Sequence, residues 1–118
     1  MKIGYLEIVT PDVDGTCKMY SVAYGIEFSG PVAALGNART TQLPGGGKLG
    51  IRAPMRESEA PVVRPYFEVD NIESTVESIR GAGGEIAVPP MQLPGEGFCA
   101  IALRGGIDHG IWQSENKG

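Results

Sequence analysis

The polarity pattern at the start of the chain changes from a period of two to a helical period. Residues 5–9 alternate between apolar and polar side chains, which is typical of a half-buried strand. Beyond them apolar residues recur every three or four positions. Thr10-Pro11-Asp12 offers a cap, a proline at the first helical position and an acidic first turn, and Gly25 terminates the run. The pattern predicts a strand followed by a helix over 11–25.

Short extended segments follow this helix. Residues 32–35, 38–43 and 48–52 are apolar or alternating, and glycines separate them, as in hairpins. The first half therefore reads β-α-β-β-β. Residues 54–62 show no periodicity and contain several prolines and charges, which indicates a linker over the surface.

The second half repeats this order. An alternating strand and a helix capped at Asn71 come first, and three more strands follow. The strand predictions are 64–69, 86–88, 97–103 and 107–113, and the helix ends at Gly83-Gly84.

The two halves also match residue by residue. A shift of 59 positions places Asp12-Val13-Asp14 on Asn71-Ile72-Glu73, and a shift of 60 places the glycine pattern of 43–51 on that of 103–111. One module would leave one face of its sheet bare, so two must combine. We expect one domain over 1–118, with module one at 1–53, a linker at 54–62, module two at 63–114 and a tail at 115–118.

Composition and charge exclude several classes of partner. The formal net charge of −4 gives no electrostatic basis for nucleic-acid binding, and no apolar run approaches the length of a membrane span. We expect a cytoplasmic protein with no nucleic-acid partner and no membrane partner. Cys17 and Cys99 form no paired motif and read as buried small hydrophobic residues.

Taken together, these features resemble the vicinal oxygen chelate superfamily, the group of glyoxalases, bleomycin-resistance proteins and extradiol dioxygenases. The resemblance rests on the stretch 8–20 with Pro11-Asp12, its repeat at 67–79, the prolines of 89–95 and the closing Gly110-Ile111-Trp112-Gln113. It implies an α+β fold of two paired βαβββ modules, forming a curved, partly open mixed β-sheet with a helix on the outer face of each module. It also implies a homodimer.

Metal-dependent members of this superfamily place a His or Gln early in each module and a Glu near its end. Those positions fall on Tyr5, Gly50, Arg64 and Gly110. Glycine has no donor, arginine stays cationic and a neutral phenol binds divalent ions poorly. We therefore expect the usual metal site to be lost and predict no cofactor, although the resemblance alone would suggest a divalent metal.

Strand alternation predicts which side chains share the face away from the helices. A mixed aromatic and charged surface of this kind suits a small organic ligand with an anionic group. The predicted ligand-binding residues are Tyr5, Glu7, Arg52, Arg64, Tyr66, Glu68 and Trp112.

Other roles remain open for these residues. Glu7 and Glu68 are candidate catalytic bases, but they can instead pair with Arg52 and Arg64 in a buried network. His109, the only histidine, is either a general base or metal ligand, or a structural or surface residue, and its parity places it with the helix side or the rim.

Two functions fit the sequence best, and a purely structural partner domain is a third alternative. The first is a small-molecule-binding protein of the glyoxalase and bleomycin-resistance type that lacks the usual metal site. The second is a metal-independent or atypical glyoxalase-like lyase or isomerase, in which Glu7 or Glu68 acts as general base on an anionic substrate.

Overall fold

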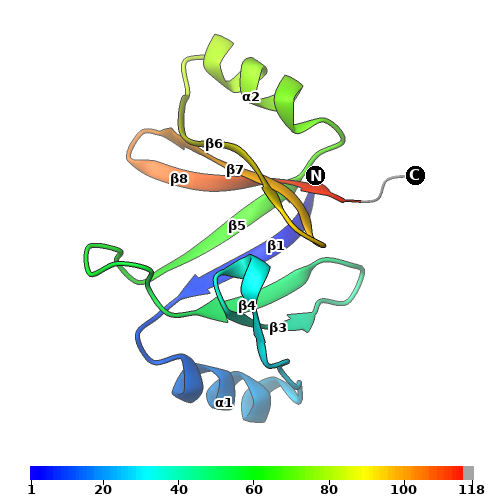
Figure 1. The fold of residues 1–118 in the computed structure, drawn as a ribbon, viewed down its shortest axis with the longest axis vertical. Coiled ribbons are helices and arrows are strands. Elements are labelled where there is room, and N and C mark those ends of the chain that lie inside the picture. The colour runs from blue at the N-terminus through cyan, green and yellow to red at the C-terminus, as the bar shows by residue number, and fades with distance from the viewer. Residues whose placement is uncertain (116–118) are drawn as a thin grey trace. The chain divides into compact units, whose positions relative to one another are not determined.

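The computed structural model describes residues 1–115, and the β-α-β-β-β order occurs twice along it, as predicted (Figure 1). The last three residues of the predicted tail, 116–118, lie outside the described residues. The first set of elements is β1 (Lys2–Val9), α1 (Val13–Tyr24), β2 (Pro31–Val32), the 3₁₀ helix η1 (Ala33–Leu35), β3 (Ala38–Gln42) and β4 (Lys48–Arg52). The second set is β5 (Val62–Glu68), α2 (Ile72–Gly81), β6 (Glu85–Leu93), β7 (Gly97–Arg104) and β8 (Ile107–Ser114).

Hydrogen bonds join the strands in the order β2-β3-β4-β1-β5-β8-β7-β6, so the α+β class with a mixed sheet is confirmed. β5 and β8 run parallel, whereas β3 with β4 and β7 with β8 run antiparallel. The chain divides into two compact units. We call Leu6–Val63 the N-terminal unit, and Met1–Tyr5 with the chain from Arg64 onward the C-terminal unit.

In the N-terminal unit, α1 packs on one face of the strands. Its first turn is capped by Asp12, whose Oδ1 accepts a hydrogen bond from the Gly15 amide at 3.1 Å, and Gly25 ends it with a φ of 64°. The buried cluster contains Ile8, Cys17, Leu49 and Ile51. The parity predicted for β1 and β4 is therefore correct.

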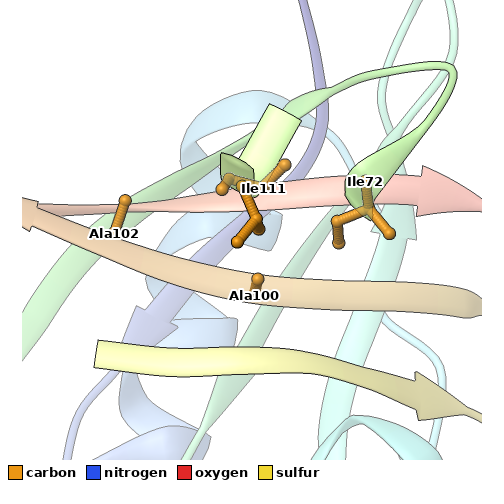
Figure 2. Packing of buried hydrophobic residues seen from close by; sticks show 5 residues of the cluster. Ile72, Ala100, Ala102 and Ile111 are labelled. Atoms are coloured by element: carbon orange, nitrogen blue, oxygen red, sulfur yellow. The ribbon is translucent and has the colours of Figure 1, made fainter. Parts of the chain in front are cut away.

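The C-terminal unit has its own core between α2 and the strands β6, β7 and β8 (Figure 2). Asn71 caps α2 by accepting from the Ser74 amide at 3.0 Å. Gln113 Oε1 of β8 accepts from the Ile72 amide at 2.8 Å, which ties the helix start to that strand. The buried residues of the cluster are Ile72, Val76, Ala100, Ala102 and Ile111.

Two strand predictions differ from the structure. Only Pro31–Val32 of the predicted segment 32–35 is extended, because the Gly36 amide donates to the Ala33 carbonyl and closes a 3₁₀ turn. β6 runs to Leu93 instead of ending at Val88. β6 ends the strand order, and an edge strand tolerates prolines on its unpaired side.

A search of the described residues finds no helix long and apolar enough to cross a membrane.

Candidate functional site

Three aromatic side chains from three strands meet in the C-terminal unit. The Tyr5 and Trp112 rings stack with centroids 5.2 Å apart, and Tyr66 meets both edge-on at 5.7 and 6.1 Å. All three side chains are buried. Tyr66 and Trp112 alternate along β5 and β8 with the residues that face α2, so they lie on the opposite face of these strands. We call this the helix-free face of the C-terminal unit.

Two glycines let these rings lie flat against the backbone. A Cβ atom on Gly110 would collide with three atoms of the Tyr66 ring. A Cβ on Gly4 would lie 2.7 Å from Cδ1 of Trp112 and 3.2 Å from Oε1 of Glu68. The space above Gly110 is thus filled by the Tyr66 ring.

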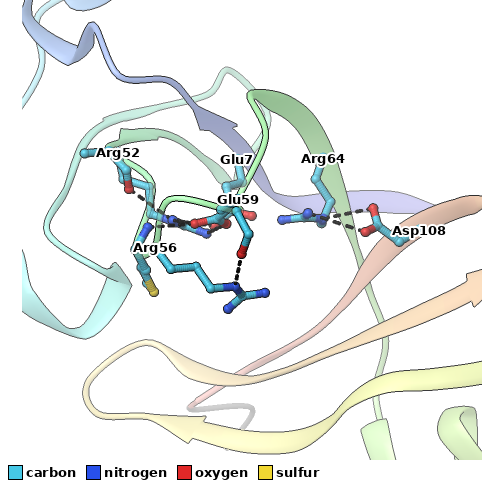
Figure 3. A network of polar contacts seen from close by, with 9 residues as sticks. Glu7, Arg52, Arg56, Glu59, Arg64 and Asp108 are labelled. Carbon is cyan, nitrogen blue, oxygen red and sulfur yellow. Dashed lines mark hydrogen bonds and ion pairs between the residues drawn. The ribbon is translucent and has the colours of Figure 1, made fainter.

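Charged side chains accompany the rings on the helix-free face. Arg64 donates from Nε to Asp108 Oδ1 at 3.1 Å and from Nη2 to Oδ2 at 3.4 Å (Figure 3). Lys2 Nζ lies 3.7 Å from Glu68 Oε1. The Arg64 and Glu68 side chains are 11% and 17% exposed, so both keep limited access to solvent.

His109 contributes to the other side of β8. Its ring centroid lies 5.4 Å from that of Phe67. By strand alternation, both side chains point to the face opposite that of Trp112. The structure therefore gives His109 a packing contact at the helix side, which is the structural alternative.

The N-terminal unit holds a buried ionic network instead of a free pair of charges (Figure 3). Arg52 donates from Nε to Glu7 Oε2 at 2.8 Å, and from Nη1 and Nη2 to the two oxygens of Glu59 at 3.0 and 2.7 Å. Glu59 also accepts from the Met55 amide at 2.8 Å. The Arg52 and Glu7 side chains are only 6% and 7% exposed.

These contacts fix the charge state of Arg52. Burial lowers the pKa of the guanidinium, but the hydrogen bonds to Glu59 and then to Glu7 outweigh it, so the pKa lies above the ordinary arginine value. A guanidinium held between two carboxylates forms strong, charge-assisted hydrogen bonds. Glu7 is thereby committed to an ion pair, which is the network alternative for this residue.

The predicted ligand-binding residues divide between the two units. Glu7 and Arg52 belong to the network of the N-terminal unit. Those in the C-terminal unit are Tyr5, Arg64, Tyr66, Glu68 and Trp112.

The sequence analysis did not predict two of the carboxylates that pair with these arginines. Asp108 shares its strand parity with Trp112, so alternation along 107–113 could have found it. Glu59 lies in the aperiodic segment 54–62, where no pattern marks a residue whose side chain is only 15% exposed. The predicted surface linker thus carries one carboxylate that is largely shielded from solvent and pairs with Arg52.

In the C-terminal unit, the residues at the expected metal-ligand positions do not suit a divalent ion. Arg64 is a cation paired with Asp108, and the ring of Tyr66 occupies the space above Gly110. Among residues 1–115, no group of three or more His, Cys, Asp or Glu side chains could hold a metal ion.

No protein-family model matches the chain, and no curated protein matches it in sequence. Solved structures do match it over nearly its whole length. A hypothetical protein from Bacillus halodurans C-125 aligns with a TM-score of 0.79 at 12% identity, covering 99% of this chain and 96% of that one.

Methylmalonyl-CoA epimerases have the same fold. The Mycobacterium tuberculosis enzyme aligns with a TM-score of 0.77 at 14% identity, covering 98% of this chain and 89% of that one. A Streptomyces coelicolor epimerase variant in complex with 2-nitronate-propionyl-CoA gives 0.73 at 18% identity, with 98% and 99% covered. The chain therefore shares the fold of these proteins.

The contact of the Tyr66 ring with Gly110 predicts that a methyl group at this position destabilises the protein. Gly110→Ala should destabilise the protein by about 1–3 kcal/mol, because the new Cβ overlaps the Tyr66 ring. The double variant Gly110→Ala/Tyr66→Ala should lose less free energy of unfolding than the two single variants lose in sum. Urea unfolding measures all three. Gly30→Ala is the control, since a Cβ there meets no atom within 4 Å; equal effects at both glycines would contradict the assignment.

The buried network predicts that the same substitution has different costs in different surroundings. Glu59→Gln should lower the free energy of unfolding by about 1.5–3 kcal/mol, because charge-assisted bonds to Arg52 are lost in a buried site. Glu77→Gln removes the exposed pair with Arg80 at 2.8 Å and should cost less than about 0.5 kcal/mol. Chemical denaturation of both variants tests this; similar losses would contradict the network's role.

Proposed function

We propose that this chain is a small-molecule-binding protein of the glyoxalase and bleomycin-resistance type, and that its site lies on the helix-free face of the C-terminal unit. The observation that carries the proposal is the meeting of Tyr5, Tyr66 and Trp112 beside Arg64 and Glu68. The three rings are buried, so a ligand reaches their flat faces by displacing the groups that cover them, while the more accessible charged groups orient its polar end.

The charged residues support an anionic ligand without a resident metal. Arginine can hold a carboxylate or phosphate in a two-pronged geometry, whereas the positions Arg64 and Gly110 offer no donor to a cation. The Streptomyces coelicolor epimerase variant was solved with 2-nitronate-propionyl-CoA, so a protein of this fold accommodates an organic ligand. We also propose, from the resemblance, a cytoplasmic homodimer; light scattering of the purified protein measures the subunit number.

The same three rings could instead serve only as core, since burial of aromatic side chains is itself stabilising. The two roles differ in whether a ligand changes the environment of Trp112. This residue is the sole tryptophan of the chain, so its fluorescence reports on this place alone.

Ligand binding is predicted to change Trp112 fluorescence. Titration with benzoate and with phenylphosphonate should quench or shift the emission saturably, because the ligand's body would contact the stacked Tyr5 and Trp112 rings. Tyr66→Leu should weaken binding at least several-fold by removing one ring of the cluster. Tyr24→Leu, on the exposed end of α1, is the control and should leave binding unchanged. A flat titration by fluorescence and by calorimetry would refute the proposal.

A second candidate function is proton transfer by Glu68 in a metal-independent lyase or isomerase. Of the two predicted bases, Glu7 is locked to Arg52 at 2.8 Å, whereas Glu68 lies beside Trp112 with Lys2 at 3.7 Å. Glu68 is thus better placed to accept a proton from a ligand over the rings.

If Glu68 is a base, Glu68→Gln should abolish exchange of an acidic C–H of a bound thioester or keto acid with deuterated water, while binding persists. Proton NMR of the ligand, with catalytic amounts of protein, measures the exchange. The control is Glu73→Gln on α2. Exchange that is absent in the unaltered protein would leave binding as the function. Exchange that is equal in Glu68→Gln would exclude Glu68 as the base.

A further inference from the structure

The two arginines predicted to bind a ligand are held very differently. Arg52 is 6% exposed, and its carboxylate partners Glu7 and Glu59 are 7% and 15% exposed at distances of 2.8 and 2.7 Å. Arg64 is 11% exposed, but its partner Asp108 is 36% exposed, and the bonds are longer, at 3.1 and 3.4 Å. The Arg64 pair is thus the more open of the two.

Burial decides how readily a carboxylate partner can be exchanged. A carboxylate that is 36% exposed keeps part of its hydration, so leaving its arginine costs it less than it would cost a buried carboxylate. A carboxylate buried with its arginine cannot leave without an uncompensated charge. Asp108 therefore meets the condition for exchange with another anion, and Glu59 and Glu7 do not.

The position of Asp108 also fits an exchangeable group. It lies one residue after β8 begins at Ile107, next to the turn formed by Gly105 and Gly106. Its two carboxylate oxygens engage the guanidinium through Nε and Nη2, as a carboxylate or phosphate of a ligand would. Two residues beyond Arg64 on the same face of β5 lies Tyr66, at the edge of the ring cluster.

Resting on the function proposed above, we propose that Arg64 is the anion anchor of the site and that Asp108 is its exchangeable counter-ion. A carboxylate or phosphate group of the ligand takes the place of the Asp108 carboxylate on Arg64, and the ligand's body lies over the rings. Asp108 then competes with the ligand. It selects for an anionic group, because a neutral ligand gains nothing by displacing it.

The competition predicts that removing the charge of Asp108 tightens binding. Asp108→Asn should bind benzoate and phenylphosphonate at least about two- to fivefold more tightly, since that is the range for an exposed ion pair and this pair is partly buried. Benzamide, which is neutral, should show no gain. Arg64→Gln should weaken both anions at least tenfold. Calorimetry and Trp112 fluorescence measure the affinities, and the carboxylate and phosphonate arms show which anion the site prefers.

The control is Asp70→Asn, which removes one negative charge from an exposed position outside this pair and so changes the net charge equally. Thermal melts of each variant confirm folding. If the unaltered protein binds and Asp108→Asn binds equally or more weakly than Asp70→Asn, the counter-ion role is overturned while the proposed function stands. If no probe binds either the unaltered protein or Asp108→Asn, both proposals fail.

Discussion

The C-terminal unit depends on the alternation of side chains along its strands, which separates a helix-facing core from a second, chemically different face. Successive side chains point to opposite faces, so each of β5 and β8 can supply a helix-facing set and a second set of different chemistry. Ile111 packs with Ile72 and Val76 under α2. Its neighbours Gly110 and Trp112 belong to the other face, where the rings and charges gather. A candidate site can therefore diverge without disturbing the core that supports it.

The aromatic cluster is tightly seated because two backbone positions lack a side chain. Gly110 receives the Tyr66 ring, and Gly4 receives the Trp112 ring. Cores tolerate little added volume, so these glycines and rings constrain each other. In the N-terminal unit, Arg52 of β4 instead pairs with Glu59 and so holds the following segment against the strand. A network of buried charges there favours a fixed structure, whereas the more open Arg64 pair of the C-terminal unit favours recognition.

Much of the fold follows from local patterns in the sequence. The Asp70-Asn71 cap, the terminating Gly25 and the parity of Ile8 and Ile111 are short-range features, and each predicts its element correctly. The predicted start of α1 lies two residues too early, because Asp12 and not Thr10 accepts the hydrogen bond that caps the helix. The periodicity of polar and apolar residues does not predict side-chain contacts between distant segments. Glu59 reaches Arg52 from an aperiodic segment, and the ring of Tyr66 fills a space that the glycine at 110 alone suggests is empty. Both depend on tertiary packing that a pattern of polarity does not contain.

The central claim is that an anionic organic ligand binds on the helix-free face of the C-terminal unit. Nitrogen-15 NMR spectra recorded with and without saturating phenylphosphonate test it most directly, since they report on every backbone amide and on the single indole N–H. The largest shifts should occur at the Trp112 indole and at the amides around Tyr66 and Arg64, while the amides of Ile72 and Val76 should change little. Shifts confined to α2, or spread without a maximum near Trp112, would contradict it.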